Sequence, residues 1–193
     1  MNRIFGVLAA FAIVCLLATF MLGLSLRSGN IRDRNDAASQ RSGTVHRLSG
    51  IATGLIVVLV DSVVVTYFVG TSRWTKEVVD TYQLDRQFIA RSNRLKRMTF
   101  PVAVASMLIA VGIVALGGAA DPGAIMPSPA EALHVPLGTV TWGNIHFAGA
   151  GLGIAAICAG FYVCWNNIVA NHAVIGDVLE EVKRIRAERG LDS

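Results

Sequence analysis

Four apolar runs, each long enough to cross a lipid bilayer, constrain this 193-residue sequence more than any other feature. They cover about residues 4–26, 45–70, 100–118 and 142–169. An α-helix rises 1.5 Å per residue, so about 20 apolar residues cross the roughly 30 Å hydrocarbon core. Apolar residues make up 53% of the chain and charged residues only 16%, unlike the composition of soluble domains. The sequence therefore predicts an all-α integral membrane protein, a four-transmembrane-helix bundle forming a single domain (1–193) within the lipid bilayer.

The first run has a competing interpretation as a secretory signal, because Arg3 gives it a short basic start. Its apolar stretch is longer than the roughly 7–15 residues of a signal core, and no small-x-small cleavage site follows it. We therefore expect the first run to be retained as a helix.

The distribution of charge predicts the orientation in the cell membrane. Loop 71–99 carries seven Lys and Arg against three Asp and Glu, whereas loop 119–141 contains Asp121 and Glu131 and no basic residue. Because cytoplasmic loops are enriched in Lys and Arg, loop 71–99 should be cytoplasmic and loop 119–141 outside. The tail 170–193 and both termini are then cytoplasmic. The loop after the first run also has four arginines, Arg27, Arg32, Arg34 and Arg41, but the larger bias of loop 71–99 decides the prediction.

Apolar residues at helical spacing continue outside the spans. In the loop they are Val78, Val79, Tyr82, Phe88, Ile89 and Leu95, and in the tail they are Ile175, Val178, Leu179, Val182 and Ile185. This periodicity predicts two cytoplasmic amphipathic helices, with the tail helix packed against the loop helix or a partner subunit. Outside, Ser128-Pro129-Ala130-Glu131 is a capping-box sequence and predicts a short helix from Pro129 to about His134.

Two spans carry stripes of small and polar residues at helical spacing, which should face other helices. The stripe of the second span is His46, Gly50, Thr53, Gly54, Val57 and Asp61. The stripe of the fourth span is His146, Ala150, Gly153, Ile157, Gly160 and Cys164. The predicted topology puts both histidines near the outer end of their helices, at similar depth.

Two opposed imidazoles above small residues could ligate a b-type haem, which makes His46 and His146 candidate iron ligands. The alternative is that both simply form hydrogen bonds at the level of the lipid headgroups. His134 lies in the outer loop, where a solvent-exposed histidine is the simpler interpretation, and His172 lies on the opposite side of the membrane. Apart from haem iron, no metal-ligand spacing is present.

Asp61 is the one acidic residue inside a predicted span. Burying a carboxylate there is costly, so we expect it to be neutral, bonded to Ser62 or Ser106, or close to Lys96 and Arg97. Its functional interpretation is a proton relay. The alternative interpretation is a hydrogen bond between helices.

Residues His46-Arg47-Leu48-Ser49-Gly50 resemble the H-R-x-S-G motif of the cytochrome b subunit of succinate dehydrogenases. The resemblance covers five residues. It implies that Arg47 and Ser49 would help to bind a quinone.

These observations favour a non-enzymatic membrane protein, a packing or scaffold subunit that requires no cofactor and assembles as a homo- or hetero-oligomer. The alternative is a haem- or quinone-linked electron-transfer subunit, and a third hypothesis is a proton-linked transporter that uses Asp61. Hydrolase and phosphate-loop motifs are absent from the sequence. Its basic residues gather between and after the spans, which indicates orientation and argues against nucleic acid as a partner.

Overall fold

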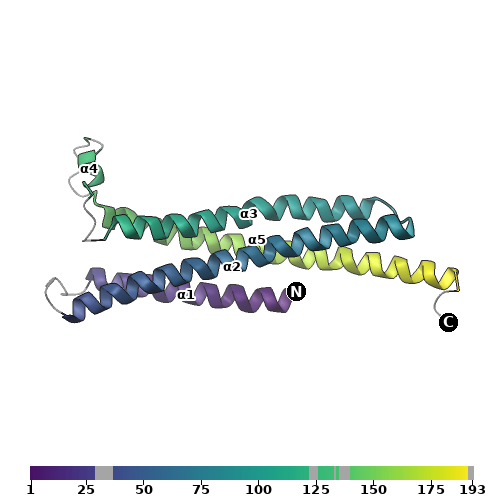
Figure 1. The fold of residues 1–193 in the computed structure, drawn as a ribbon, viewed down its shortest axis with the longest axis horizontal. Helices are drawn as coiled ribbons and strands as arrows, with labels where there is room; N and C mark the ends of the chain where they lie inside the picture. Colours follow the sequence, from purple (N-terminus) through teal and green to yellow (C-terminus); the bar gives the residue numbers. More distant parts are fainter. Residues whose placement is uncertain (29–36, 122–125, 133, 135–139, 191–193) are drawn as a thin grey trace.

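The computed structural model describes residues 1–28, 37–121, 126–132, 134 and 140–190. Their helices are α1 (Asn2–Ser28), α2 (Ala37–Tyr82), α3 (Gln87–Ala119), the short α4 (Pro129–Ala132) and α5 (Trp142–Glu188), as Figure 1 shows. The helices α1, α2, α3 and α5 are each long and apolar enough to cross a membrane. The predicted all-α fold with four such helices is therefore confirmed.

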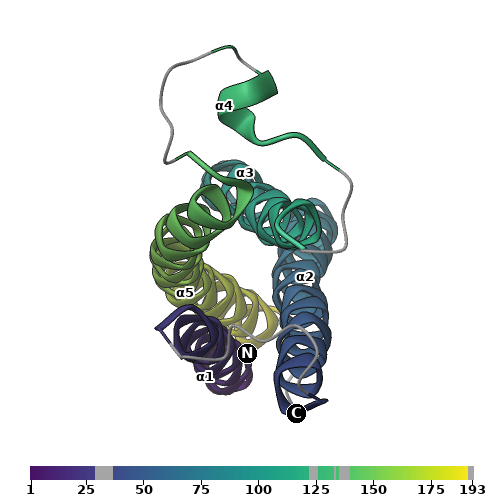
Figure 2. The same ribbon diagram turned by 90° about the vertical axis from the view of Figure 1, so that its left-hand side faces the viewer.

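The four long helices form one bundle, seen end-on in Figure 2. Helices α2 and α5 each pack against both α1 and α3. They therefore stand on opposite sides of the bundle, with α1 and α3 between them. Side chains that point inward from α2 and α5 can meet across the bundle axis.

The two ends of the bundle differ because the helices differ in length. Helix α1 has 27 residues, whereas α2 and α5 have 46 and 47, which corresponds to a rise of about 70 Å. We call the end where α1 finishes and α5 begins the histidine end, and the opposite end, at the turn between α2 and α3, the basic end. Helix α1 begins part-way along the bundle and runs to the histidine end, so only α2, α3 and α5 extend to the basic end (Figure 1).

The two predicted amphipathic helices are not separate elements among the described residues. Residues 71–99 form the last turns of α2, a tight turn at 83–86 and the first turns of α3, while residues 170–188 continue α5. Hydropathy falls at these borders, but α2 contains no proline and ends only before Gln83, whose φ is 56°. Val178, Val182 and Ile185 of the tail pack into a small core with Val79 and Leu84.

The capping box at Ser128–Glu131 forms as the sequence predicts. The Glu131 backbone N–H donates to Ser128 Oγ (3.2 Å), and the Ser128 N–H donates to a Glu131 carboxylate oxygen (3.0 Å). Helix α4 ends at Ala132, two residues before the predicted end.

The main core lies between all four long helices. It combines small and β-branched residues, such as Ala12 and Val57, with the rings of Phe5, Phe68 and Phe161. Glycine lets α5 approach α3 closely, because a Cβ added to Gly160 would lie 2.5 Å from Ser106 Oγ. The glycine-rich stripe of α5 is thus occupied by contacts within the chain.

A candidate cofactor site between His46 and His146

The structure brings His46 and His146 together, although they are 100 residues apart in the sequence. His46 lies on α2 and His146 on α5, the two helices that face each other across the histidine end. Their ring centroids are 6.3 Å apart, with an angle of 70° between the ring planes.

This separation suits two imidazoles on opposite sides of one metal ion. A metal–nitrogen bond to histidine is about 2 Å long and each ring adds about 1 Å, which gives about 6 Å between ring centres. The same separation also lies within the range of ordinary aromatic pairs, about 4.5–7 Å. Distance alone therefore does not separate ligation from simple packing.

The hydrogen bonding of the two rings supplies a second criterion. In each ring Nδ1 is buried and has no hydrogen-bond partner. Buried polar atoms in proteins are nearly always paired, and an unpaired one costs about 1–3 kcal/mol. Two such nitrogens in neighbouring rings indicate a place where an electron-pair acceptor can bind.

Each ring is also positioned by a glycine on the adjacent helix. A Cβ added to Gly23 of α1 would lie 2.8 Å from His46 Cε1, and one added to Gly117 of α3 would lie 3.1 Å from His146 Cε1. The rings further interact with the backbone of Thr19 and Ile113, each four residues before its glycine. Metal-ligating histidines commonly use a backbone carbonyl in this way to fix the ring.

Two arginines lie at the same end of the bundle. Arg27 Nη2 donates to Asn144 Oδ1 (2.9 Å), and its guanidinium lies 4.7 Å from the centre of the Phe147 ring. Arg47 pairs with Asp121 at 2.6 Å. Asp121 compensates the charge of Arg47, whereas the amide and the ring beside Arg27 are uncharged.

The candidate quinone residues have partners within the chain. Arg47 is engaged by Asp121, and Ser49 Oγ donates to the carbonyl of His46 at 2.9 Å. Neither contact points to a second ligand. The quinone interpretation of Arg47 and Ser49 stays a prediction from the motif.

Asp61 does not belong to the histidine site. It is 15 residues further along α2, a rise of about 22 Å. It is fully buried, and neither of its carboxylate oxygens has a hydrogen-bond partner. The expected bond from Ser62 is wrong, because Ser62 Oγ donates to the carbonyl of Val58.

The other two histidines lie elsewhere. His134 follows α4, where its Nδ1 lies 3.0 Å from the carbonyl oxygen of Glu131, and His172 is exposed on α5. Within the part of the chain that the structure describes, no three His, Cys, Asp or Glu side chains gather as a metal-binding group.

Sequence reasoning missed a set of buried amides. Asn167 and Asn171 are one turn apart on α5 and both are buried. Asn167 Nδ2 donates to Thr99 Oγ1 at 2.9 Å, and Asn171 Nδ2 donates to Thr71 Oγ1 at 3.0 Å. Two amides at i and i+4 near the end of an apolar span were the available signal.

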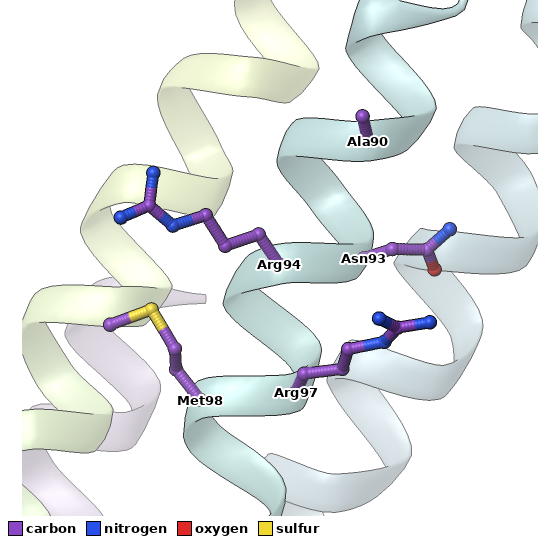
Figure 3. A pocket seen from close by; sticks show the side chains of 5 residues that line it. All are labelled: Ala90, Asn93, Arg94, Arg97 and Met98. Atoms are coloured by element: carbon purple, nitrogen blue, oxygen red, sulfur yellow. The ribbon is translucent and has the colours of Figure 1, made fainter.

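An open surface pocket of about 470 Å³ lies on α3 towards the basic end (Figure 3). It is lined by Ala90, Asn93, Arg94, Arg97 and Met98. Figure 3 shows the side chains of Arg94 and Arg97 extending away from each other. None of the predicted site residues lines this pocket.

Comparisons of this chain with protein-family models, curated proteins and solved structures found no match.

Proposed function

We propose that this protein is a membrane subunit that binds one b-type haem between His46 and His146 and serves electron transfer. The observation that carries the proposal is the pairing of the two rings at 6.3 Å with both Nδ1 atoms buried and unpartnered. Their placement on facing helices of a four-helix bundle is a known way to hold a cofactor in a bundle core.

Haem fits this ligand set better than a bare metal ion. A structural or catalytic metal ion in a protein usually takes three or four protein ligands, and the described residues offer two at this place. Haem supplies the remaining nitrogens itself and needs only axial ligands from the chain.

When bound, a haem with two histidine ligands supplies one-electron reduction and oxidation of its iron without an open coordination position. The chain holds the two half-buried rings against Gly23 and Gly117. Arg27 at the same end of the bundle would help to balance the negative charge of the haem propionates. The electron donor and acceptor would be redox proteins or a quinol that reach the histidine end.

A packing subunit without cofactor is the second candidate, because the ring geometry also fits an edge-to-face contact. Such a subunit would assemble with itself or with partners through surfaces other than the glycine stripe, which lies inside the bundle. The two candidates differ in one measurable property, the visible spectrum.

The deciding experiment is a reduced-minus-oxidised visible spectrum of protein produced with adequate haem supply. We expect a Soret band and about one haem per chain in wild-type protein. His46→Ala and His146→Ala should each lose the haem, whereas His134→Ala and His172→Ala serve as controls and should retain it.

Each outcome decides between the candidates. Wild-type protein without Soret absorbance would overturn the haem proposal and favour the packing subunit. Haem retained in both His46→Ala and His146→Ala would overturn the assignment of the ligands while leaving a haem protein.

The orientation in the membrane is part of the proposal. The basic end should lie in the cytoplasm with both termini, and the histidine end on the outer side, because loop 71–99 has the larger excess of basic residues. Labelling of single cysteines introduced at Gly123 and Ser193 tests this orientation; both positions lie outside the described residues. External labelling at Ser193, or labelling at Gly123 only from inside, would contradict it.

A further inference from the structure

Buried polar side chains are distributed unequally along the bundle. The structure describes nine of them, and eight lie at the level of Asp61 or nearer the basic end. We call these eight the polar column: Asp61, Ser72, Thr75, Ser92, Thr99, Ser106, Asn167 and Asn171. The ninth, Thr53, shares a hydrogen bond with Thr19 towards the histidine end.

Hydrogen bonds among the described residues join members of the polar column in two separate groups. Asn167 of α5 is bonded to Thr99 of α3. One turn further, Asn171 accepts from Ser92 Oγ at 3.4 Å, and Ser92 shares a hydrogen bond with Ser72 of α2 at 3.3 Å. Asn171 also donates to the Tyr67 hydroxyl at 3.2 Å. Both groups lie on the basic-end side of Asp61, whose carboxylate oxygens, like Thr75 Oγ1, have no hydrogen-bond partner, so water has to bridge the remaining gaps.

Asp61 stands at the inner end of the polar column. Cys164 on α5 is a titratable side chain close to Asp61. Residues 98–119 of α3, and 142–171 of α5, contain no Asp, Glu, Lys or Arg, and the charged residues of α1 are Arg3 and Arg27 near its two ends. No basic side chain on the packed helices is therefore at hand to neutralise this carboxylate.

On its other side Asp61 meets an apolar layer. Val57 and Ile157 are fully buried, and Val60 is 1% exposed. Thr53 lies eight residues from Asp61 on α2, a rise of about 12 Å across this layer. Val64 and Phe68, on the basic-end side of Asp61, are buried as well, so the two sides of Asp61 differ in their buried hydroxyl and amide groups, which are concentrated on the basic-end side.

We propose that Asp61 is a protonated carboxyl that exchanges its proton with the basic end through the polar column, and not with the histidine end. This inference does not depend on the haem. Threonine and serine hydroxyls can accept one proton while they donate another, and the amides of Asn167 and Asn171 can hold bridging water. Each exchange releases one proton from the carboxyl and returns one, so the charge of Asp61 is unchanged at the end.

The test compares two isosteric substitutions on opposite sides of Asp61. Thr99→Val removes a hydroxyl from the polar column, and the matched control Thr53→Val removes one beyond the apolar layer. The readout is the infrared carbonyl band of the protonated carboxyl, assigned by its loss in Asp61→Asn. After transfer of purified protein into D₂O, the rate at which this band shifts gives the rate of proton exchange.

We expect Thr99→Val to slow the exchange about tenfold, because one hydrogen bond of the route is lost. Thr53→Val should change the rate less than about twofold. Equal slowing in both variants, slowing in neither, or stronger slowing in Thr53→Val would overturn the proposed route. Absence of the carbonyl band in wild-type protein would overturn the protonated state. Should Thr99→Val fail to fold, Ser92→Ala removes another hydroxyl of the column and carries the same expectation.

Discussion

The histidine end and the basic end both contain buried polar atoms, but these atoms differ in their hydrogen bonding. At the basic end Asn171 is bonded to three residues, and Ser72 is bonded to Ser92. At the histidine end, four helices surround two rings whose Nδ1 atoms are left unpaired. Polar groups that satisfy one another stabilise the packing, whereas the two unpaired nitrogens are the observation on which the haem proposal rests.

The largest effect is expected from displacing a histidine ring at the histidine end without removing it. In Gly23→Ala the new Cβ would come within 2.8 Å of His46 Cε1, so the ring must move while the backbone stays. We expect haem affinity to fall about 10–100-fold, as for other substitutions that disturb the orientation of a ligand. Haem titration of the purified apoprotein measures this effect.

The control for this prediction is Gly112→Ala on α3. A Cβ there would have nothing within 4 Å, so haem affinity should not change. Equal loss of affinity in both variants would indicate a general effect of alanine on the bundle. It would contradict the claim that the position of the His46 ring determines haem affinity.

A smaller effect is expected from removing one side chain of the hydrogen-bonded group at the basic end. Asn171→Ala leaves Tyr67, Thr71 and Ser92 without this partner, and should lower the free energy of unfolding by about 1–2 kcal/mol. The neighbouring Asn166 is exposed, so Asn166→Ala should change it by less than about 0.5 kcal/mol. Unfolding in mixed micelles compares the two variants. Loss of haem in Asn171→Ala with unchanged stability would show that the two ends are not independent.

The smallest effect is expected at Asp61. If the carboxyl is neutral, Asp61→Asn replaces one neutral polar group by another of the same shape, and stability should change by less than about 0.5 kcal/mol. The same unfolding measurement applies. Strong loss of folded or assembled protein, or an infrared carboxylate band in the wild type at neutral pH, would show that Asp61 is ionised and paired.

Much of the fold could be predicted because hydropathy is a local property. The spans near 4–26, 45–70, 100–118 and 142–169 all lie inside long helices of the structure. Where the apolar signal ended, however, the predicted helices ended too early. Residues 71–82 continue α2 and residues 170–188 continue α5, because backbone hydrogen bonding does not depend on side-chain hydropathy.

The candidate site was predictable only in part. The sequence placed His46 and His146 at the same end and depth, from helical periodicity and the count of spans. It suggested hydroxyl partners for Asp61, but neither carboxylate oxygen has a partner. It also overlooked Asn167 and Asn171, since the predicted fourth span ended between them.

The sequence by itself therefore determined how many helices could cross a membrane, roughly where each begins, and which faces carry small residues, because these follow from residues near one another in the chain. Only the tertiary structure decided that α2 and α5 face each other, with Gly23 and Gly117 against the two rings. It also decided that the basic end has three helices and a hydrogen-bonded polar column. The reason is physical: which helices become neighbours depends on the packing of side chains from all four helices together, and periodicity within one helix does not contain that information.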